Sequence, residues 1–180
     1  MRHSKMHYAA ILTLMLTATP ALATSLVDKC LVGKWVPDMA KVSKSLRKLS
    51  DAPKSQVSGS VLMIIKARGA SEFRVKNWSL MKIYSDSKRL DLRVSGKAKF
   101  TVSAPHGGEF HFAEQSNTYK QKLIDYKFGM ANTFEVEPIW QMLPMGEWAH
   151  GTIKCSAKTL VFKVSDQDSD GNMFTVWHRK

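Results

Sequence analysis

The densest group of carboxylates in the chain is Asp166-Gln167-Asp168-Ser169-Asp170-Gly171. Alternate carboxylates followed by a glycine open an EF-hand calcium loop, because the carboxylates can point at one ion while the glycine permits a sharp turn. The twelfth position of such a loop needs a bidentate glutamate, and here it is Trp177. We therefore interpret the segment as a polar loop between two strands and expect no metal site in it.

Other side chains that perform chemistry are present without a recognised arrangement. The histidines beyond the N-terminal segment are His106, His111, His150 and His178, and none has a partner at a metal-ligand spacing. A Gly-x-Ser-x-Gly nucleophile motif is also absent from the sequence. These observations predict a protein that is not an enzyme and that carries neither a metal nor another cofactor.

The segment 138–148, Pro-Ile-Trp-Gln-Met-Leu-Pro-Met-Gly-Glu-Trp, is unusually apolar for a loop. Methionines adapt to the shape of a ligand, and tryptophans supply flat apolar walls. We expect this loop to fold over a barrel mouth, or alternatively to complete the core at the end of the barrel. The candidate ligand-binding residues are Trp140, Met142, Met145 and Trp148.

The first 23 residues have the pattern of a secretory signal peptide. Arg2 and Lys5 precede an apolar stretch that is shorter than the roughly 20 residues of a membrane span, and Ala21-Leu22-Ala23 offers a cleavage site. The alternative is a retained membrane anchor. We expect residues 1–23 to be removed and residues 24–180 to form one domain in the periplasm or outside the cell. Cleavage removes two basic residues and no acid, so the net charge of +12 becomes +10.

The only two cysteines, Cys30 and Cys155, both lie in the expected mature domain. An even number of cysteines in an exported chain is most simply explained by a disulfide. The alternative is a pair of unpaired, buried thiols.

Hydrophobic spacing predicts one helix and many strands. Met39, Val42, Leu46 and Leu49 recur at helical spacing after a possible N-cap, Asp38, and lysines and an arginine occupy the remaining face. Such a helix can cover a core or lie on an anionic membrane. From Val57 onward, about ten short runs predict strands, with Ser95-Gly96-Lys97 as a tight hairpin turn between two of them.

This pattern predicts a mainly β fold: an antiparallel barrel with one short amphipathic helix after the first strand. A two-sheet sandwich would give a similar pattern.

Gly33-Lys34-Trp35 at the first expected strand resembles the Gly-x-Trp signature of lipocalins. The position of Cys30 just before it, of Cys155 in a late strand and of Leu160 soon after is similar to bacterial exported lipocalin-like domains. The resemblance implies a lipocalin-like barrel whose base is closed by Trp35, with a late arginine, here Arg179, stacked on its ring.

Two functions remain open. The first is an exported, non-enzymatic carrier of a small apolar or amphipathic ligand, which the barrel pattern and the apolar loop favour. The alternative is a basic interaction module that docks on an anionic membrane surface, a host surface or a protein partner, which the net charge favours. Nucleic acid is the less favoured partner, because only Phe73-Arg74-Val75-Lys76-Asn77-Trp78 interleaves aromatic and basic residues and the chain is expected to be exported.

Overall fold

The computed structural model describes residues 27–49, 52–104, 108–136, 150–164 and 175–180. The expected signal peptide, the carboxylate-rich loop at 166–171 and the apolar loop at 138–148 lie outside the described residues.

The described chain consists of one helix and ten strands, and every strand pairing is antiparallel. The elements in chain order are β1 (Gly33–Pro37), α1 (Met39–Leu49), β2 (Lys54–Ile65), β3 (Ala70–Ser85), β4 (Lys88–Ser103), β5 (Glu109–Asn117), β6 (Lys120–Lys127), β7 (Met130–Glu135), β8 (His150–Cys155), β9 (Thr159–Val164) and β10 (Val176–Arg179).

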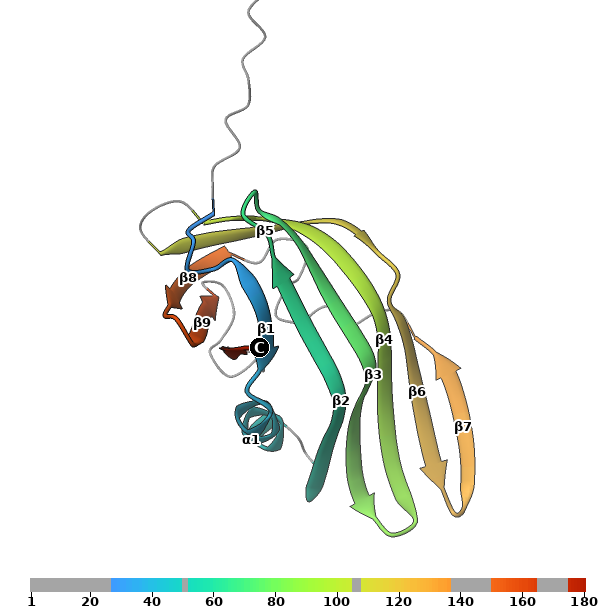
Figure 1. The fold of residues 1–180 in the computed structure, drawn as a ribbon. Helices are drawn as coiled ribbons and strands as arrows, with labels where there is room; N and C mark the ends of the chain where they lie inside the picture. The colour runs from blue at the N-terminus through green and yellow to red at the C-terminus, as the bar shows by residue number, and fades with distance from the viewer. Residues whose placement is uncertain (1–26, 50–51, 105–107, 137–149, 165–174) are drawn as a thin grey trace, which may run out of the picture.

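Eight of these strands close into a barrel, in the order β3-β2-β1-β10-β9-β8-β5-β4, with β4 pairing back to β3. The predicted fold class, an antiparallel barrel with a short helix after the first strand, is confirmed. The strands β6 and β7 lie outside this ring. They extend the sheet from the lower half of β4, so that the long strands β2, β3 and β4 continue below the barrel (Figure 1).

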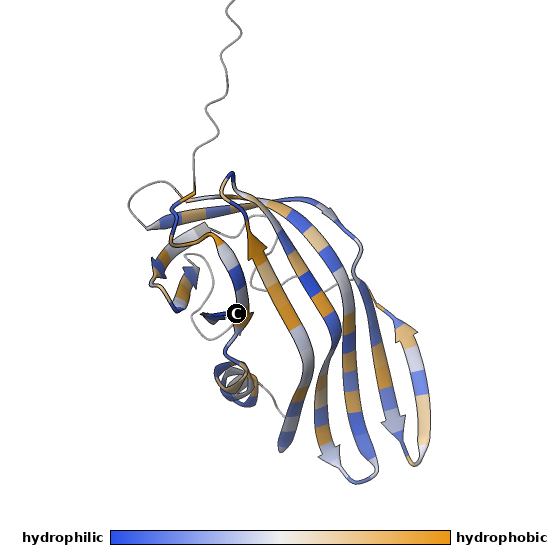
Figure 2. Cartoon of the chain, in the orientation of Figure 1, coloured by the Kyte–Doolittle hydropathy of each residue, from blue (hydrophilic) through white to orange (hydrophobic). Residues whose placement is uncertain are grey.

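The alternation of side chains along the strands explains why the sheet curls around a core. In β3, Phe73 and Val75 are buried, whereas Arg74 and Lys76 are exposed. The same alternation of apolar and polar residues marks β3 and β4 in Figure 2. Because successive side chains of a strand point to opposite faces, one face of each strand is apolar and packs inward.

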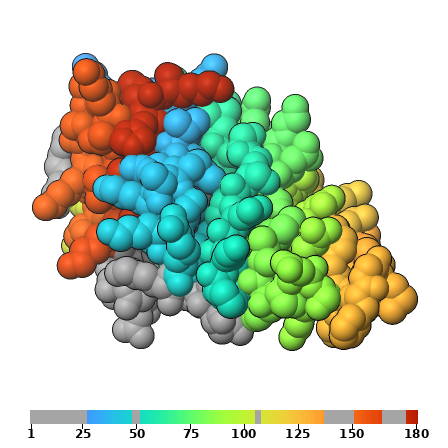
Figure 3. Space-filling view, turned by 90° about the horizontal axis from the view of Figure 1, so that it is seen from below, coloured from blue at the N-terminus to red at the C-terminus, as the bar shows by residue number. Residues whose placement is uncertain are grey.

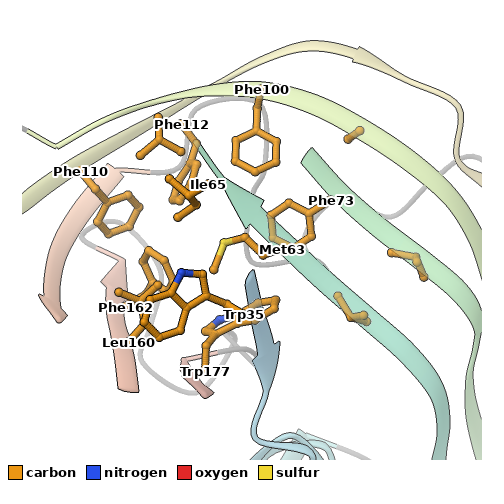
Figure 4. Close-up of a cluster of buried hydrophobic side chains, with 14 of the residues drawn as sticks. Trp35, Met63, Ile65, Phe73, Phe100, Phe110, Phe112, Leu160, Phe162 and Trp177 are labelled. Carbon is orange, nitrogen blue, oxygen red and sulfur yellow. The ribbon is translucent and has the colours of Figure 1, made fainter. Parts of the chain in front are cut away.

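Aromatic side chains fill the interior of the barrel (Figure 4). Phe73 lies between Trp177 and Phe100, with ring centroids 5.6 and 5.1 Å apart. The contacts continue through Phe112, 5.3 Å from Phe100, to Phe162 at 5.6 Å. An eight-stranded barrel is just wide enough for side chains to fill it, and these rings do so from one wall to the other.

The prediction of a hairpin at Ser95-Gly96-Lys97 is wrong, because β4 runs unbroken from Lys88 to Ser103. Its first half pairs with β6 and its second half with β5. Gly96, at φ 140°, is the point of exchange, and a Cβ there would lie 2.5 Å from the carbonyl oxygen of Thr118. The glycine is therefore required by the close approach of the β5–β6 connection and not by a turn.

A disulfide and the contacts of Arg179 join the N-terminal and C-terminal parts of the described domain. A disulfide joins Cys30 to Cys155 across 125 positions of sequence. The guanidinium of Arg179 lies 4.3 Å from the centre of the Trp35 ring, and it donates hydrogen bonds to the carbonyl oxygens of Cys30, Val32 and Ala157. The disulfide predicted from the even number of cysteines is confirmed, and Arg179 lies over the Trp35 ring as expected for these two residues.

The helix α1 begins at the predicted N-cap. The backbone N–H of Lys41 donates to the carboxylate of Asp38 over 3.1 Å, and this hydrogen bond is the main reason why the pKa of Asp38 is lowered. Val42 and Leu46 are buried in the core and Met39 packs against it, so the helix covers the barrel with these residues. No helix among the described residues is long and apolar enough to span a bilayer.

Candidate interaction surface

The four candidate ligand-binding residues, Trp140, Met142, Met145 and Trp148, lie outside the described residues, so the apolar-ligand hypothesis stays a prediction. The described part of the barrel interior bears on it nonetheless. The ring contacts between Trp177, Phe73 and Phe100 occupy the lumen at their level. A ligand bound there would have to displace buried aromatic side chains.

Shifted pKa values in the described chain have structural causes. Hydrogen bonds lower the pKa of Asp38 and of Glu72, and hydrogen bonds to carboxylates raise the pKa of Arg74 and of Arg93. Burial raises the pKa of Tyr119. Each shift holds its group more firmly in its usual charge state at pH 7. A general acid or base needs the opposite, a pKa moved toward neutrality.

The described histidines do not form a metal centre. His178 lies 3.3 Å from the carboxylate of Asp38, and His111 stands opposite His150 in the pairing of β5 with β8. No group of three or more histidine, cysteine, aspartate or glutamate side chains in the described ranges could hold a metal ion.

The run with aromatic and basic residues, 73–78, lies in β3. Phe73, Val75 and Trp78 are buried in the core, and the residues of the run that reach the surface are Arg74, Lys76 and Asn77. Stacking on bases requires exposed rings, and these rings are covered by protein.

The most distinctive surface lies at the lower end of the extended sheet, where two turns come together. Lys88, the first residue of β4, stands opposite Lys127, the last residue of β6. The backbone N–H of Phe128 donates to the carbonyl oxygen of Ser87 over 2.9 Å, so a hydrogen bond joins the β3–β4 turn to the β6–β7 turn. The two turns therefore present one combined edge.

Like charges face each other across β4 and β6. Besides Lys88 and Lys127, Arg93 stands opposite Lys122. Directly opposed like charges destabilise a sheet. Carboxylates lie within ion-pair distance of three of these cations: Asp125 at 2.9 Å from Lys127, Asp91 at 2.7 Å from Arg93, and Glu135 at 3.8 Å from Lys122.

Aromatic rings lie against Lys88 and against one further cation, Arg89, at the same edge. The guanidinium of Arg89 lies 4.1 Å from the centre of the Tyr126 ring, and the ammonium of Lys88 lies 4.9 Å from that of Tyr84. Such contacts restrict where the charges can go. The edge therefore presents cations in defined positions.

Comparison of the chain with protein-family models, with curated proteins and with solved structures finds no match. The lipocalin resemblance is therefore neither supported nor opposed by a relative.

The β6–β7 hairpin, which carries Lys127, also has exposed apolar side chains. Phe128 is 83% exposed, Met130 is 66% exposed and Phe134 is 52% exposed. All three belong to the β6–β7 hairpin. Single exposed apolar residues are ordinary, but three on one hairpin make it a candidate interaction surface.

The backbone at Phe128 is strained in a way that exposes its ring. Phe128 and Gly129 form a two-residue hairpin loop with φ of 51° and 82°. This type I′ geometry suits Asn-Gly and costs a bulky residue about 1 kcal/mol or more. Phe128 is not among the candidate residues expected from the sequence, and Gly129 between two alternating runs is the signal that could have indicated this turn.

The surrounding end of the molecule is also basic. Seen from below, α1, the start of β2, the β3–β4 turn and the β6–β7 hairpin share one face (Figure 3). We call this face the cationic end. The elements that share it carry the exposed basic residues Lys41, Lys44 and Arg47 of α1, Lys54 of β2, and Lys88, Arg89 and Lys127 at the two turns. Among the acidic residues of the same elements and their caps, Asp38 caps α1, Asp125 pairs with Lys127, Glu135 pairs with Lys122, and Asp86 is exposed in the β3–β4 turn.

Proposed function

We propose that this protein is an exported, non-enzymatic interaction module that docks on an anionic partner through its cationic end. The observation that carries the proposal is the opposed pair Lys88 and Lys127, at an edge where two turns are hydrogen-bonded together. Arg89, the next residue of β4, adds a cation on the other face of the same edge. Asp125 pairs with Lys127 over 2.9 Å and offsets part of the repulsion between the two lysines. The positive charge that remains at this edge attracts an anionic partner.

The cations of the helix support the same function. Because Val42 and Leu46 pack into the core, Lys41, Lys44 and Arg47 are left on the outer face of α1. Their charge adds to that of the turns on the same face (Figure 3). A concentration of one sign of charge attracts an oppositely charged partner and steers its approach.

A carrier of a small apolar ligand has weaker support. The barrel fold is compatible with it, and its proposed binding residues at 140–148 remain a prediction. The described lumen, however, is occupied by the rings of Phe73, Phe100 and Phe112, which touch one another.

The docking function can be separated from simple net charge by a matched pair of variants. The test variant is Lys88→Gln/Arg89→Gln/Lys127→Gln. The control, Lys154→Gln/Lys158→Gln/Lys163→Gln, removes three exposed lysines from β8, β9 and their connection, so both variants have the same net charge. The purified proteins are compared by the salt concentration at which they elute from immobilised heparin.

We expect the test variant to elute at clearly lower salt than the control variant, because the three cations at the turns act together on one anionic surface. Circular dichroism melting of both variants checks that the fold is retained. Equal elution of the two variants would mean that only net charge matters, and the proposed function would be wrong.

A further inference from the structure

Resting on the proposed function, we propose that the anionic partner is a phospholipid bilayer, and that the tip of the β6–β7 hairpin inserts the side chains of Phe128 and Met130 among its headgroups.

The exposure of the tip is the first reason. Phe128 is the most exposed large apolar side chain in the described chain, and Met130 follows it. They flank Gly129 at the end of a hairpin that lies outside the barrel ring. A projecting apolar tip can enter a bilayer interface without any change in the rest of the fold.

The backbone geometry is the second reason. The positive φ of Phe128 is held by the paired strands on either side and by the hydrogen bond from its N–H to Ser87. Strain of this kind persists where the surrounding structure enforces it, and it often marks a functional position. Asn or Gly at this position would give an easier turn without an apolar ring.

The charges around the tip identify the partner. Lys88, Arg89 and Lys127 lie at the base of the projecting residues, where they would reach lipid phosphates as the ring of Phe128 enters the interface. Exposed basic residues near an anionic bilayer strengthen binding, and apolar side chains add affinity that salt does not screen.

A second copy of this chain fits the tip poorly. The β7 strand is exposed along its whole length, and an edge strand can pair with another chain. Pairing at the tip, however, would bring together two copies of the same cationic group, and like charges across an interface oppose association.

The test measures co-sedimentation of the purified protein with vesicles of 30% phosphatidylglycerol and 70% phosphatidylcholine, and with vesicles of phosphatidylcholine alone. Phe128→Asn removes the ring and creates the preferred Asn-Gly turn, so it leaves the melting temperature unchanged or raises it. Val161→Asn removes the exposed apolar side chain of β9 and serves as the matched control.

We expect wild type and Val161→Asn to bind the anionic vesicles equally, and Phe128→Asn to bind about tenfold more weakly. The variant Lys88→Gln/Arg89→Gln/Lys127→Gln should lose about 100-fold, since each cation near the surface contributes about fivefold. The tryptophan fluorescence of Phe128→Trp should be quenched more strongly than that of wild type by anionic vesicles that carry a quencher at the level of the headgroups.

The outcomes separate the two proposals. Insertion is overturned if Phe128→Asn binds the vesicles as well as wild type does, or if the tryptophan fluorescence of Phe128→Trp is quenched no more than that of wild type. The docking function would still stand in that case, provided the heparin experiment succeeds. A concentration-dependent dimer that Phe128→Asn abolishes would assign the tip to a second copy and would likewise overturn insertion.

Discussion

Gly59 of β2 lies directly against the backbone of Asn77 of β3. A Cβ on Gly59 would overlap the carbonyl group of Asn77 and would lie 2.5 Å from the Cα of Trp78. The strand register shifts at the same level in both strands, between Ser58 and Ser60 in β2 and between Val75 and Trp78 in β3. With the partner exchange of β4 at Gly96, these irregularities form a crease between the barrel and the extended lower sheet.

The close contact at the crease predicts that Gly59→Ala lowers the free energy of unfolding by more than the cost of placing alanine at a positive φ. Gly129, with φ 82° against 89° for Gly59, has nothing within 4 Å of its own Cβ position, so Gly129→Ala measures the cost of positive φ alone. We expect about 1 kcal/mol for Gly129→Ala and at least about 2 kcal/mol for Gly59→Ala in urea unfolding. Equal losses would show that the two strands are not in close contact at the crease.

The contacts of Arg179 predict different outcomes for two substitutions at this position. The guanidinium donates to three backbone carbonyl groups and stacks on Trp35, a geometry that lysine cannot reproduce. We expect Arg179→Ala to lower the free energy of unfolding by about 2 kcal/mol, and Arg179→Lys to recover only a small part of it.

The control for this comparison is Lys180→Ala, at the neighbouring exposed position, which should change the free energy of unfolding by less than about 0.5 kcal/mol. A fully stable Arg179→Lys protein would contradict a role for the fork-shaped guanidinium.

Much of the fold follows from local sequence signals. The alternation of Phe73, Val75 and their polar neighbours predicts a strand, and Asp38 ahead of a helical apolar face predicts the start of α1. In both cases the signal lies within a few residues of the structure that it predicts.

The interaction surface and the crease could not be predicted in the same way. Gly96 in a polar tripeptide is compatible with a turn, and only the approach of Thr118 shows that it lies in a continuous strand. The pairing of Lys88 with Lys127 depends on which strand follows the lower half of β4. The choice of partner is a long-range property, and no local pattern reports it.

Asp38 should make stability depend on pH. Its pKa is lowered from 3.8 by the hydrogen bond from the N–H of Lys41 and by His178. A lowered folded-state pKa stabilises the protein above the unfolded pKa, and this contribution is lost as the pH falls through the folded pKa. The difference in unfolding free energy between wild type and Asp38→Asn should be present at pH 7 and disappear at acidic pH below the folded pKa.

The comparison with Asp38→Ala separates the charge from the cap. Asparagine can still accept the hydrogen bond of an N-cap, whereas alanine cannot, so Asp38→Ala should cost about 1 kcal/mol at pH 7 and remain destabilised at low pH. An Asp38→Asn protein whose difference from wild type does not vary with pH would show that the carboxylate charge has no part in stability.

The disulfide between Cys30 and Cys155 should be the largest single contribution to stability outside the core. It closes a loop of 125 residues, for which the loss of unfolded-chain entropy corresponds to about 4 to 5 kcal/mol, although measured effects are often smaller. We expect Cys30→Ser/Cys155→Ser to unfold at a much lower urea concentration, with a larger dependence of the free energy on urea because its unfolded chain is less constrained.

Dithiothreitol should lower the stability of wild type toward that of the variant and leave the variant unchanged. Loss of less than about 1 kcal/mol, with an unchanged urea dependence, would mean that Arg179 and the strand pairing of β1 with β10 hold the ends together without help from the disulfide.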